Sequence, residues 1–266
     1  MVRLAVVSDS HLSAREAVAN ANWDTILAHL ERSQPDIVVH AGDISLDGAN
    51  DEADLTHARA QLDRVPVPWL AVPGNHDLGE PSNAAEAVIE ARRQAYESVF
   101  GDRFWTTTVD GWRLVGLDSQ QFMDPESATE AWWQWTAAQL DTDQPTVVFQ
   151  HRPLTPTAVG EIDTPLRYLT EPARSRLKAM LARPNVRLVV SGHVHQWRSV
   201  TIDATLHVWA PSTWATLPDR IQPVIGTKVV GLLDITLGDE VTAHPITPAD
   251  TNQAIIGETI PMPYGH

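Results

Sequence analysis

Short apolar runs alternate with amphipathic stretches through the first three quarters of the chain. Runs rich in β-branched residues indicate buried strands at 3–8, 36–40, 68–73, 111–119, 145–151 and 185–191. Apolar residues at helical spacing predict helices over 23–33, 53–65, 82–100, 127–140 and 172–181. Ser82 and Ser127 are suitable N-caps for two of these helices. Alternating strands and helices favour an α/β fold with parallel strand pairing in this part.

The pattern changes after residue 197. Strands are expected within 205–211, 227–237 and 241–246, joined by short turns without helices. Residues 247–266 are rich in Pro and Thr, so we expect an extended or irregular tail. No internal repeat or linker interrupts the chain, and we therefore expect a single domain over 1–246 followed by that tail.

Metal-competent polar side chains follow five of the predicted strands. They are Asp9 and His11, Asp43, Asn75 with His76, His151, and His193 with His195. In α/β sheets the carboxyl ends of the strands carry the ligand-binding residues, so these side chains are expected to meet at one edge. Carboxylate, amide and imidazole donors suit divalent ions such as Zn, Mn, Fe or Ni.

Local spacing supports the same site. Three proposed ligands directly follow a glycine, at Gly42, Gly74 and Gly192, where the missing Cβ allows a tight turn and a close approach. An isolated His-x-His is equally compatible with a polar loop. In a nearly extended segment, however, residues two apart point the same way. Asp9 with His11, and His193 with His195, are therefore expected to face one site.

The ordered motifs resemble those of a known superfamily. Asp9-Ser-His11, Gly42-Asp43, Gly74-Asn75-His76-Asp77, His151 and Gly192-His193-Val-His195 are similar to the DxH, GD, GNH, H and GHxH pattern of the calcineurin-like metallophosphoesterases. The resemblance covers residues 7–195 and implies a four-layer αββα sandwich with two divalent metal ions, of Mn, Fe, Zn or Ni.

The resemblance also implies roles for individual residues. One ion would be held by Asp9, His11 and His195, and the other by Asn75, His151 and His193, with Asp43 as the bridge. His76 would be catalytic and no ligand, facing the substrate phosphate and assisting the leaving group. One departure is that Asp47 lies four residues after Asp43, whereas many members have an Asp three residues after the bridge that can orient the GNH histidine. Asp47 is therefore considered as a residue that could still reach and orient His76.

A subfamily is indicated by the short chain, the Asp77 that follows the GNH motif, and His151-Arg152-Pro153. These features resemble class III cyclic-nucleotide phosphodiesterases and bacterial glycerophosphodiesterases. The resemblance implies hydrolysis of a phosphodiester through a metal-bridging hydroxide. A phosphomonoesterase or protein phosphatase with the same metal core is the alternative. A non-catalytic scaffold is less favoured, because it would lack ligands or the GNH histidine.

Composition and net charge limit the kinds of binding partner that we expect. The chain has 266 residues and a formal net charge of −15, so a nucleic-acid polymer is not expected to bind. It contains no Cys, which excludes disulfides and thiolate metal sites. No stretch is long enough to span a membrane and the N-terminus fits no signal peptide, so we expect a cytoplasmic protein. A small phosphoester is the expected substrate, and a homodimer is left open.

Several other polar and aromatic residues have ordinary explanations. His40 ends a strand before Asp43, and we expect it to pack behind the site. Arg152 could contact a phosphate or form a surface salt bridge. The acidic segment 47–54 lacks the ligand spacing of a calcium loop, so a solvated loop is expected. Packing is expected for the aromatic cluster Trp132, Trp133 and Trp135, and surface or core positions for His29, His57, His207, His244 and His266.

Overall fold

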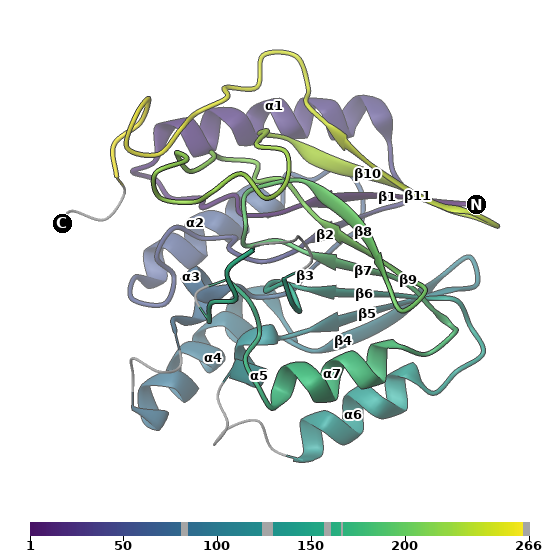
Figure 1. The fold of residues 1–266 in the computed structure, drawn as a ribbon. Coiled ribbons are helices and arrows are strands. Elements are labelled where there is room, and N and C mark those ends of the chain that lie inside the picture. The colour runs from purple at the N-terminus through teal and green to yellow at the C-terminus, as the bar shows by residue number, and fades with distance from the viewer. Residues whose placement is uncertain (81–84, 124–129, 157–160, 166, 263–266) are drawn as a thin grey trace.

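Two mixed β-sheets form the centre of the molecule (Figure 1). The computed structural model describes residues 1–80, 85–123, 130–156, 161–165 and 167–262. The first sheet has the order β11-β10-β1-β2-β3, and β1, β2 and β3 are parallel. Its strands are β1 (Val2–Val7), β2 (Ile37–His40), β3 (Trp69–Ala71), β10 (Leu232–Leu237) and β11 (Val241–Ile246).

The second sheet has the order β4-β5-β6-β7-β9-β8. Its middle strands β5, β6, β7 and β9 are parallel, and β4 and β8 add antiparallel edges. The strands are β4 (Trp105–Val109), β5 (Trp112–Leu117), β6 (Thr146–Gln150), β7 (Val186–Ser191), β8 (Arg198–Ile202) and β9 (Thr205–Trp209). The parallel pairing expected from alternating strands and helices is therefore confirmed in both sheets.

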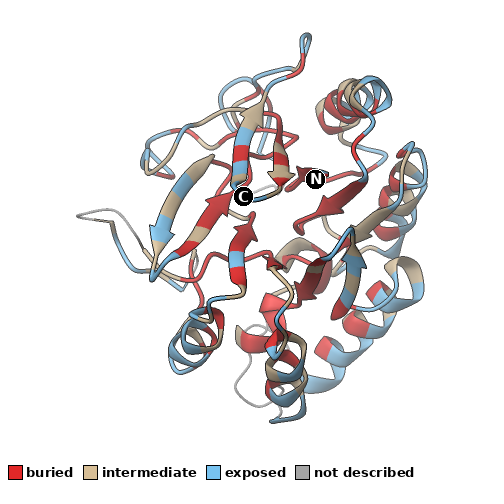
Figure 2. Ribbon diagram, turned by 90° about the vertical axis from the view of Figure 1, so that its right-hand side faces the viewer, coloured by how far each residue is buried: buried red, intermediate tan, exposed pale blue. Residues whose placement is uncertain are grey.

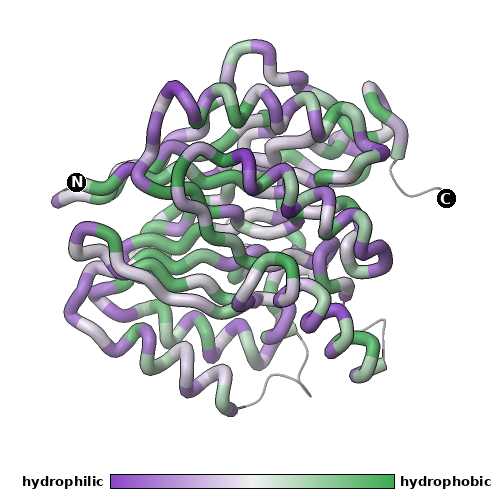
Figure 3. Tube along the Cα trace, turned by 180° about the vertical axis from the view of Figure 1, so that it is seen from behind, coloured by the Kyte–Doolittle hydropathy of each residue, from purple (hydrophilic) through white to green (hydrophobic). Residues whose placement is uncertain are grey.

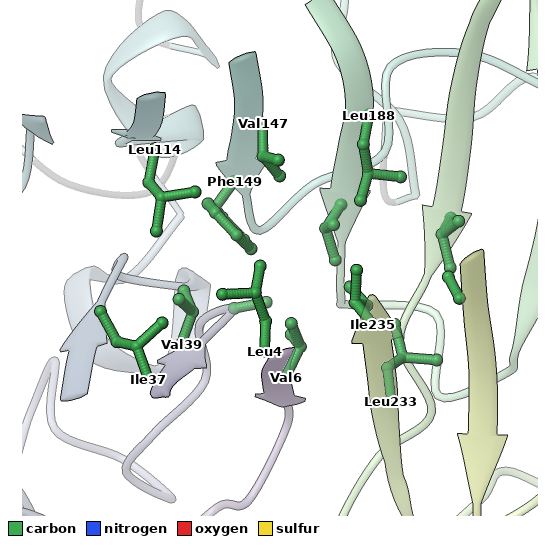
Figure 4. Packing of buried hydrophobic residues seen from close by; sticks show 14 of the residues in the cluster. Leu4, Val6, Ile37, Val39, Leu114, Val147, Phe149, Leu188, Leu233 and Ile235 are labelled. Atoms are coloured by element: carbon green, nitrogen blue, oxygen red, sulfur yellow. The ribbon is translucent and has the colours of Figure 1, made fainter. Parts of the chain in front are cut away.

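A shared apolar core lies between the sheets. Leu4 of β1 faces Phe149 of β6 across this core (Figure 4). On β1, Leu4 and Val6 belong to the core, whereas Ala5 and Val7 belong to the cluster beneath the helices. Successive side chains of a strand point to opposite faces, so a strand buried on both faces needs apolar residues at every position. This explains the continuous apolar runs of the sequence (Figure 3).

Helices cover the outer faces of both sheets, which gives the four-layer αββα architecture (Figures 1 and 2). The first sheet is covered by α1 (Ala17–Ser33), α2 (Glu52–Leu62) and α4 (Glu86–Phe100). The second is covered by α6 (Glu130–Leu140) and α7 (Ala173–Leu181). The short helices are α3 (Asn75–Leu78) and α5 (Ser119–Met123). The expected fold class is confirmed.

Some boundaries differ from the expectation. Helix α1 begins at Ala17, six residues before the expected start at Trp23. Its first turns are held by polar as well as apolar contacts, since Asn22 is buried and donates to the carbonyl of Trp214. The strand expected over 227–237 begins only at Leu232. Strands β4 and β8 were not predicted. The proposed caps Ser82 and Ser127 lie outside the described residues.

The described part of the tail, 247–262, contains turns and isolated bridges. Ile256 and Ile260 pack with Trp214 of the loop that follows β9. Among the described residues, no helix has both the length and the apolar character needed to cross a membrane.

Candidate metal centre

The predicted ligands come together where β1, β2, β6 and β7 end, between the two sheets. Ligand atoms lie within 4.8 Å of one another in three overlapping groups, namely Asp9, His11 and His195; His11, Asp43 and His76; and Asp43, His151 and His193. Asn75 joins the third group, with its Oδ1 3.3 Å from Nε2 of His151. All seven proposed ligands and His76 therefore occupy one cluster, contributed by segments distant in the sequence.

The first half of the cluster contains Asp9, His11 and His195. Nε2 of His195 lies 3.3 Å from Oδ1 of Asp9 and 3.3 Å from Nε2 of His11. Nε2 of His11 lies 3.8 Å from Oδ2 of Asp43. These nitrogen and oxygen atoms are all buried with their residues, so little water competes for them.

The second half is arranged around His151. Its Nε2 lies 3.2 Å from Oδ2 of Asp43 and 3.2 Å from Nδ1 of His193. The same Oδ2 of Asp43 approaches His11 in the first half. Asp43 therefore lies between the two halves, where one carboxylate can serve both.

Hydrogen bonds fix which ring nitrogen faces the cluster. Nδ1 of His151 donates to the carbonyl of Ala41 (2.8 Å), and Nδ1 of His195 donates to the carbonyl of Ala215 (2.6 Å). In the neutral tautomer each Nε2 then presents a lone pair to carboxylate oxygens that are also acceptors. A proton or a cation must lie between such atoms. The donor set of carboxylate, amide oxygen and oriented imidazole fits divalent metal ions.

The pKa values of the cluster follow from burial and from its carboxylates. Burial alone would lower the pKa of His151, but the Asp43 carboxylate, together with Asp9 and the carbonyl of Ala41, raises the pKa to about 9. Burial likewise opposes the charging of His195, whose pKa is nevertheless raised by Asp9. Burial would raise the pKa of Asp43, yet the surrounding histidines, His151 foremost, hold it well below its usual range. Asp43 is thus ionised and attracts positive charge.

The backbone that carries the ligands is strained. Asp9, His11, Asp43, His193 and His195 all have positive φ, between 46° and 70°. This conformation costs a non-glycine residue roughly 1–2 kcal/mol. The expectation of nearly extended DxH and HxH segments is therefore wrong, although both residues of each pair do face the cluster. Strain retained at so many positions of one site is typical of a functional centre.

Two of the predicted glycines are required by the geometry. Gly42 has a φ of +94°, and a Cβ there would lie 2.5 Å from Nδ1 of His151. A Cβ on Gly74 would collide with the carboxylate and backbone of Asp43. The close approach expected from these glycines is confirmed, because any side chain would displace ligands of the cluster.

His76 lies at the open side of the cluster. Its side chain is 24% exposed, and its Nε2 is 4.0 Å from Oδ2 of Asp43. Its Nδ1 donates to the carbonyl of Leu46 (2.8 Å), which turns Nε2 toward the cluster. The side chain of Asp47 instead accepts a hydrogen bond from Asn50. The carbonyl of Leu46 thus provides the orienting contact for which Asp47 was considered.

Other residues that hold the cluster were not assigned from the sequence. Asp77 is fully buried and accepts from the backbone N–H groups of Ile44, Ser45 and Gly74. It therefore ties the loop of Asp43 to the loop of Asn75. The Asp77 of the GNHD motif was the available signal, but its partners Ile44 and Ser45 are 33 and 32 residues away and could not be inferred.

The DxH turn has supports of its own. Ser8 donates to Oδ2 of Asp9 (2.5 Å), and Ser212 donates to the Asp9 carbonyl (2.8 Å). His40 lies behind the turn, as expected. It accepts from the N–H of Gly42 and contacts Oγ of Ser10 at 2.7 Å. Burial lowers the pKa of His40 to about 3, so the ring is neutral at pH 7.

Of the two interpretations of Arg152, the structure has a salt bridge, although its guanidinium is buried and not at the surface. Its side chain is completely buried and forms an ion pair with Glu80. It also donates to Gln120 (3.1 Å) and to the carbonyl of Pro165 (2.8 Å), so it fastens the segment at 165 to the protein. The sequence could not reveal this, because Glu80 is 72 residues away.

The packing expected for the aromatic cluster is confirmed, whereas His266 lies outside the described residues. Trp133 stacks on Phe122 and Trp132 on Phe104, in the core under α6. The acidic segment 47–54 is only partly solvated, since Asp54 is buried and accepts from Ser13.

A pocket of about 400 Å³ opens above the cluster. Its polar part includes His11, Asp43, Asn75, His76, His193 and His195, with Thr164, Arg167 and Gln222 farther along the lining. Nη1 of Arg167 is buried and has no hydrogen-bond partner among the residues that the structure describes. The pocket thus combines the ligand cluster with an unpaired cationic donor, an arrangement suited to an anionic ligand.

Comparison with known proteins gives one family. The model of the calcineurin-like phosphoesterases matches residues 2–197. The glycerophosphodiester phosphodiesterase GpdQ of Enterobacter lignolyticus is 28% identical over 236 residues, covering 83% of this chain and 78% of the relative. A probable cyclic nucleotide phosphodiesterase of Synechococcus is 26% identical over 201 residues, covering 73% of each.

A shorter match is found with the human serine/threonine-protein phosphatase CPPED1. It is 32% identical over 151 residues, which is 54% of this chain and 46% of the phosphatase. The match therefore spans less than half of the length of that relative. All of these relatives are named as hydrolases of phosphoric esters.

Solved structures agree on the fold. A dimetal phosphatase from Danio rerio superposes with a TM-score of 0.63 at 16% identity, covering 92% of this chain and 95% of that one. A purple acid phosphatase from yellow lupin gives a TM-score of 0.66 at 16% identity, covering 95% of this chain and 52% of that one. At this identity the likeness bears on the fold alone, and it matches the four-layer sandwich described above.

Proposed function

The chain belongs to the calcineurin-like phosphoesterase family, and we propose that it hydrolyses a phosphodiester with the help of two divalent metal ions. The observation that carries this proposal is the convergence of acceptor atoms around Asp43. Nε2 of His151 and Oδ2 of Asp43 lie 3.2 Å apart, with Oδ1 of Asn75 3.3 Å from the same nitrogen. Such a set of acceptors is stable only around positive charge.

The distances support a division of the ligands between two ions. Asp9, His11 and His195 would hold one ion, and Asn75, His151 and His193 the other. Asp43 would bridge them, because its Oδ2 approaches histidines of both sets. Mn, Fe, Zn and Ni all accept this mixture of oxygen and imidazole donors.

The chemistry of such a centre is well defined. Two ions, when bound, neutralise charge on a phosphoryl group and lower the pKa of water so that it can attack phosphorus. The protein contributes orientation: carbonyl groups hold the rings of His151 and His195, and the strained turns hold the carboxylates in place.

We assign His76 the role of proton donor to the leaving oxygen. Its Nδ1 is engaged by Leu46 and its Nε2 is directed to the pocket, at the exposed side of the cluster. His76 also lies close enough to His11 and Asp43 to share an ion with them. We favour the proton donor because Nε2 of His76 is 4.0 Å from Oδ2 of Asp43, whereas Nε2 of the proposed ligand His151 is 3.2 Å from the same oxygen.

The preference for a diester rests on the bacterial relatives, which match over most of their length. A phosphomonoesterase or protein phosphatase is the second candidate, because of the similarity to the human phosphatase. The test is a comparison of bis(p-nitrophenyl) phosphate with p-nitrophenyl phosphate on protein loaded with Mn²⁺. We expect a higher kcat/KM for the diester and no turnover of either ester by metal-depleted protein. A higher kcat/KM for the monoester would favour the second candidate.

A further inference from the structure

One wall of the pocket is apolar and lies directly beside the metal cluster. Its residues are Trp214, Leu217, Ile221, Ile256 and Met262. The lining also has polar residues away from the cluster, including Thr164 and Arg167. A bound molecule would therefore meet charge at the cluster and apolar surface along this wall.

The wall is built by the loop after β9 together with the C-terminal tail. Thr216 donates to the carbonyl of Ala254 (2.9 Å), and Ile256 donates to the carbonyl of Thr216 (3.0 Å). Lys228 holds the same loop by donating to the carbonyl of Leu217 (2.7 Å). These contacts join the two segments, so the wall does not depend on either alone.

The wall is also fixed relative to the metal ligands. The rings of Trp214 and His11 have centroids 4.8 Å apart. The carbonyl of Ala215, next to Trp214, accepts from Nδ1 of His195. A group on phosphorus at the cluster therefore has the apolar wall within immediate reach.

Part of this wall is left open to solvent. Ile221 is 47% exposed and Met262 is 45% exposed, and both line the pocket. Single exposed apolar residues are common on protein surfaces. Here two of them gather with buried Trp214 and Ile256 around one cavity, and a ligand that covers them would remove apolar surface from water.

We propose that this wall binds an apolar or aromatic substituent of the phosphoester, and that Ile221 is a specificity-determining residue. The inference rests on the proposed function, because it places the phosphoryl group at the metal cluster. Substrates with an aryl, nucleobase or alkyl substituent would be preferred over esters that carry only glycerol. Burial of one methylene increases affinity by about fourfold, so a substituent that places a few carbons on the wall would determine which ester binds best.

Binding of n-alkyl phosphonates tests the wall without requiring turnover. Methyl-, butyl- and hexylphosphonate are titrated by calorimetry into protein loaded with Mn²⁺. In the unmodified protein, affinity should increase by about fourfold per methylene until the wall is covered. Ile221→Ser should reduce the ratio of hexyl to methyl affinity by about tenfold, and leave the affinity for methylphosphonate unchanged.

Val224→Ser provides the matched control. Val224 is 59% exposed and belongs to the same loop, but it is not part of the pocket lining. Its variant should retain the full dependence on chain length. Equal affinity of the three phosphonates in the unmodified protein would overturn the inference, as would equal effects of the two serine variants.

Turnover separates this inference from the proposed function. If the protein hydrolyses nitrophenyl esters but binds all phosphonates equally, the wall inference fails and the proposed function stands. If affinity increases with chain length and no phosphoester is hydrolysed, the proposed function fails and the apolar wall stands.

Discussion

Nε2 of His151 lies 3.2 Å from Oδ2 of Asp43, while Nδ1 of the same ring donates to the carbonyl of Ala41. The carbonyl determines the orientation of the imidazole, so its second nitrogen must face the carboxylate. In metal-free protein this geometry is satisfied by a proton, and the pKa of His151 is accordingly raised to about 9, against the effect of burial. A metal ion must displace that proton.

Metal binding should therefore release protons below pH 9. At pH 7.5 His151 carries a proton in the metal-free protein, and binding of Mn²⁺ requires its neutral form. Apparent metal affinity should thus increase as the pH rises toward about 9 and level off above it. Calorimetric titration in two buffers of different ionisation enthalpy measures the protons released. A titration at pH 7.5 without proton release would contradict the prediction.

The bridging role of Asp43 predicts unequal effects of two substitutions. Asp43→Ala removes the carboxylate that approaches both halves of the cluster, whereas His11→Ala removes one ring from one half. We expect Asp43→Ala to lose both ions and His11→Ala to retain about one, by elemental analysis after dialysis. The rate of nitrophenyl ester hydrolysis should follow the same order. Equal and mild losses in both variants would show that Asp43 is not shared.

Asp77 should stabilise the fold as well as the site. Asp77→Ala leaves the N–H groups of Ser45 and Gly74 without their acceptor in a buried position. Each unsatisfied group costs about 1–3 kcal/mol, so the free energy of unfolding should fall by about 3 kcal/mol or more. Urea denaturation of metal-depleted protein measures this loss. Asp47→Ala is the control, because the Asp47 side chain accepts, among the described residues, only from Asn50 of its own loop. This variant should change the free energy of unfolding by less than about 1 kcal/mol.

The site was predictable because its ligands follow strands that the apolar pattern identifies. Asp9 and Asp43 end neighbouring parallel strands, and His151 and His193 end neighbouring strands of the other sheet. Local sequence therefore fixed their place at one edge, even though the left-handed backbone at these residues was not expected. The ligand roles, the cytoplasmic location and the homodimer stay predictions.

What the sequence could not predict depends on contacts between distant segments. Arg152 is bound by Glu80, and the carbonyl of Leu46 takes the orienting position for which Asp47 was considered. Backbone carbonyls and residues of other loops carry no signal in local spacing. The same reason explains why the apolar wall, in which Ile256 meets Trp214, was found only in the structure.

Arg167 should contribute to the binding of the anionic substrate. Its Nη1 is buried beside the pocket without a partner among the described residues, which is costly unless a ligand accepts from it. Arg167→Gln should raise KM for the diester by about tenfold, since a hydrogen bond to a charged group is worth about 1.5–3 kcal/mol. Metal content should not change. Arg64→Gln is the control, because Arg64 pairs with Asp24 on the surface. An unchanged KM in Arg167→Gln would show that Arg167 does not contact the substrate.

His76 provides the sharpest test of the site, because its three possible roles, namely proton donor, metal ligand and phosphate contact, predict different results. As a proton donor held by Leu46, it contributes only when the leaving oxygen needs a proton. His76→Ala should then bind both ions normally and lose about 10²–10⁴-fold in rate on alkyl or cyclic-nucleotide diesters. The loss on an aryl diester should be much smaller, because nitrophenolate departs without protonation. Elemental analysis and the rates on the two kinds of ester distinguish these roles. Loss of an ion would show that His76 is a ligand with His11 and Asp43. An equal loss of rate on all esters would show that His76 contacts the phosphate without donating a proton.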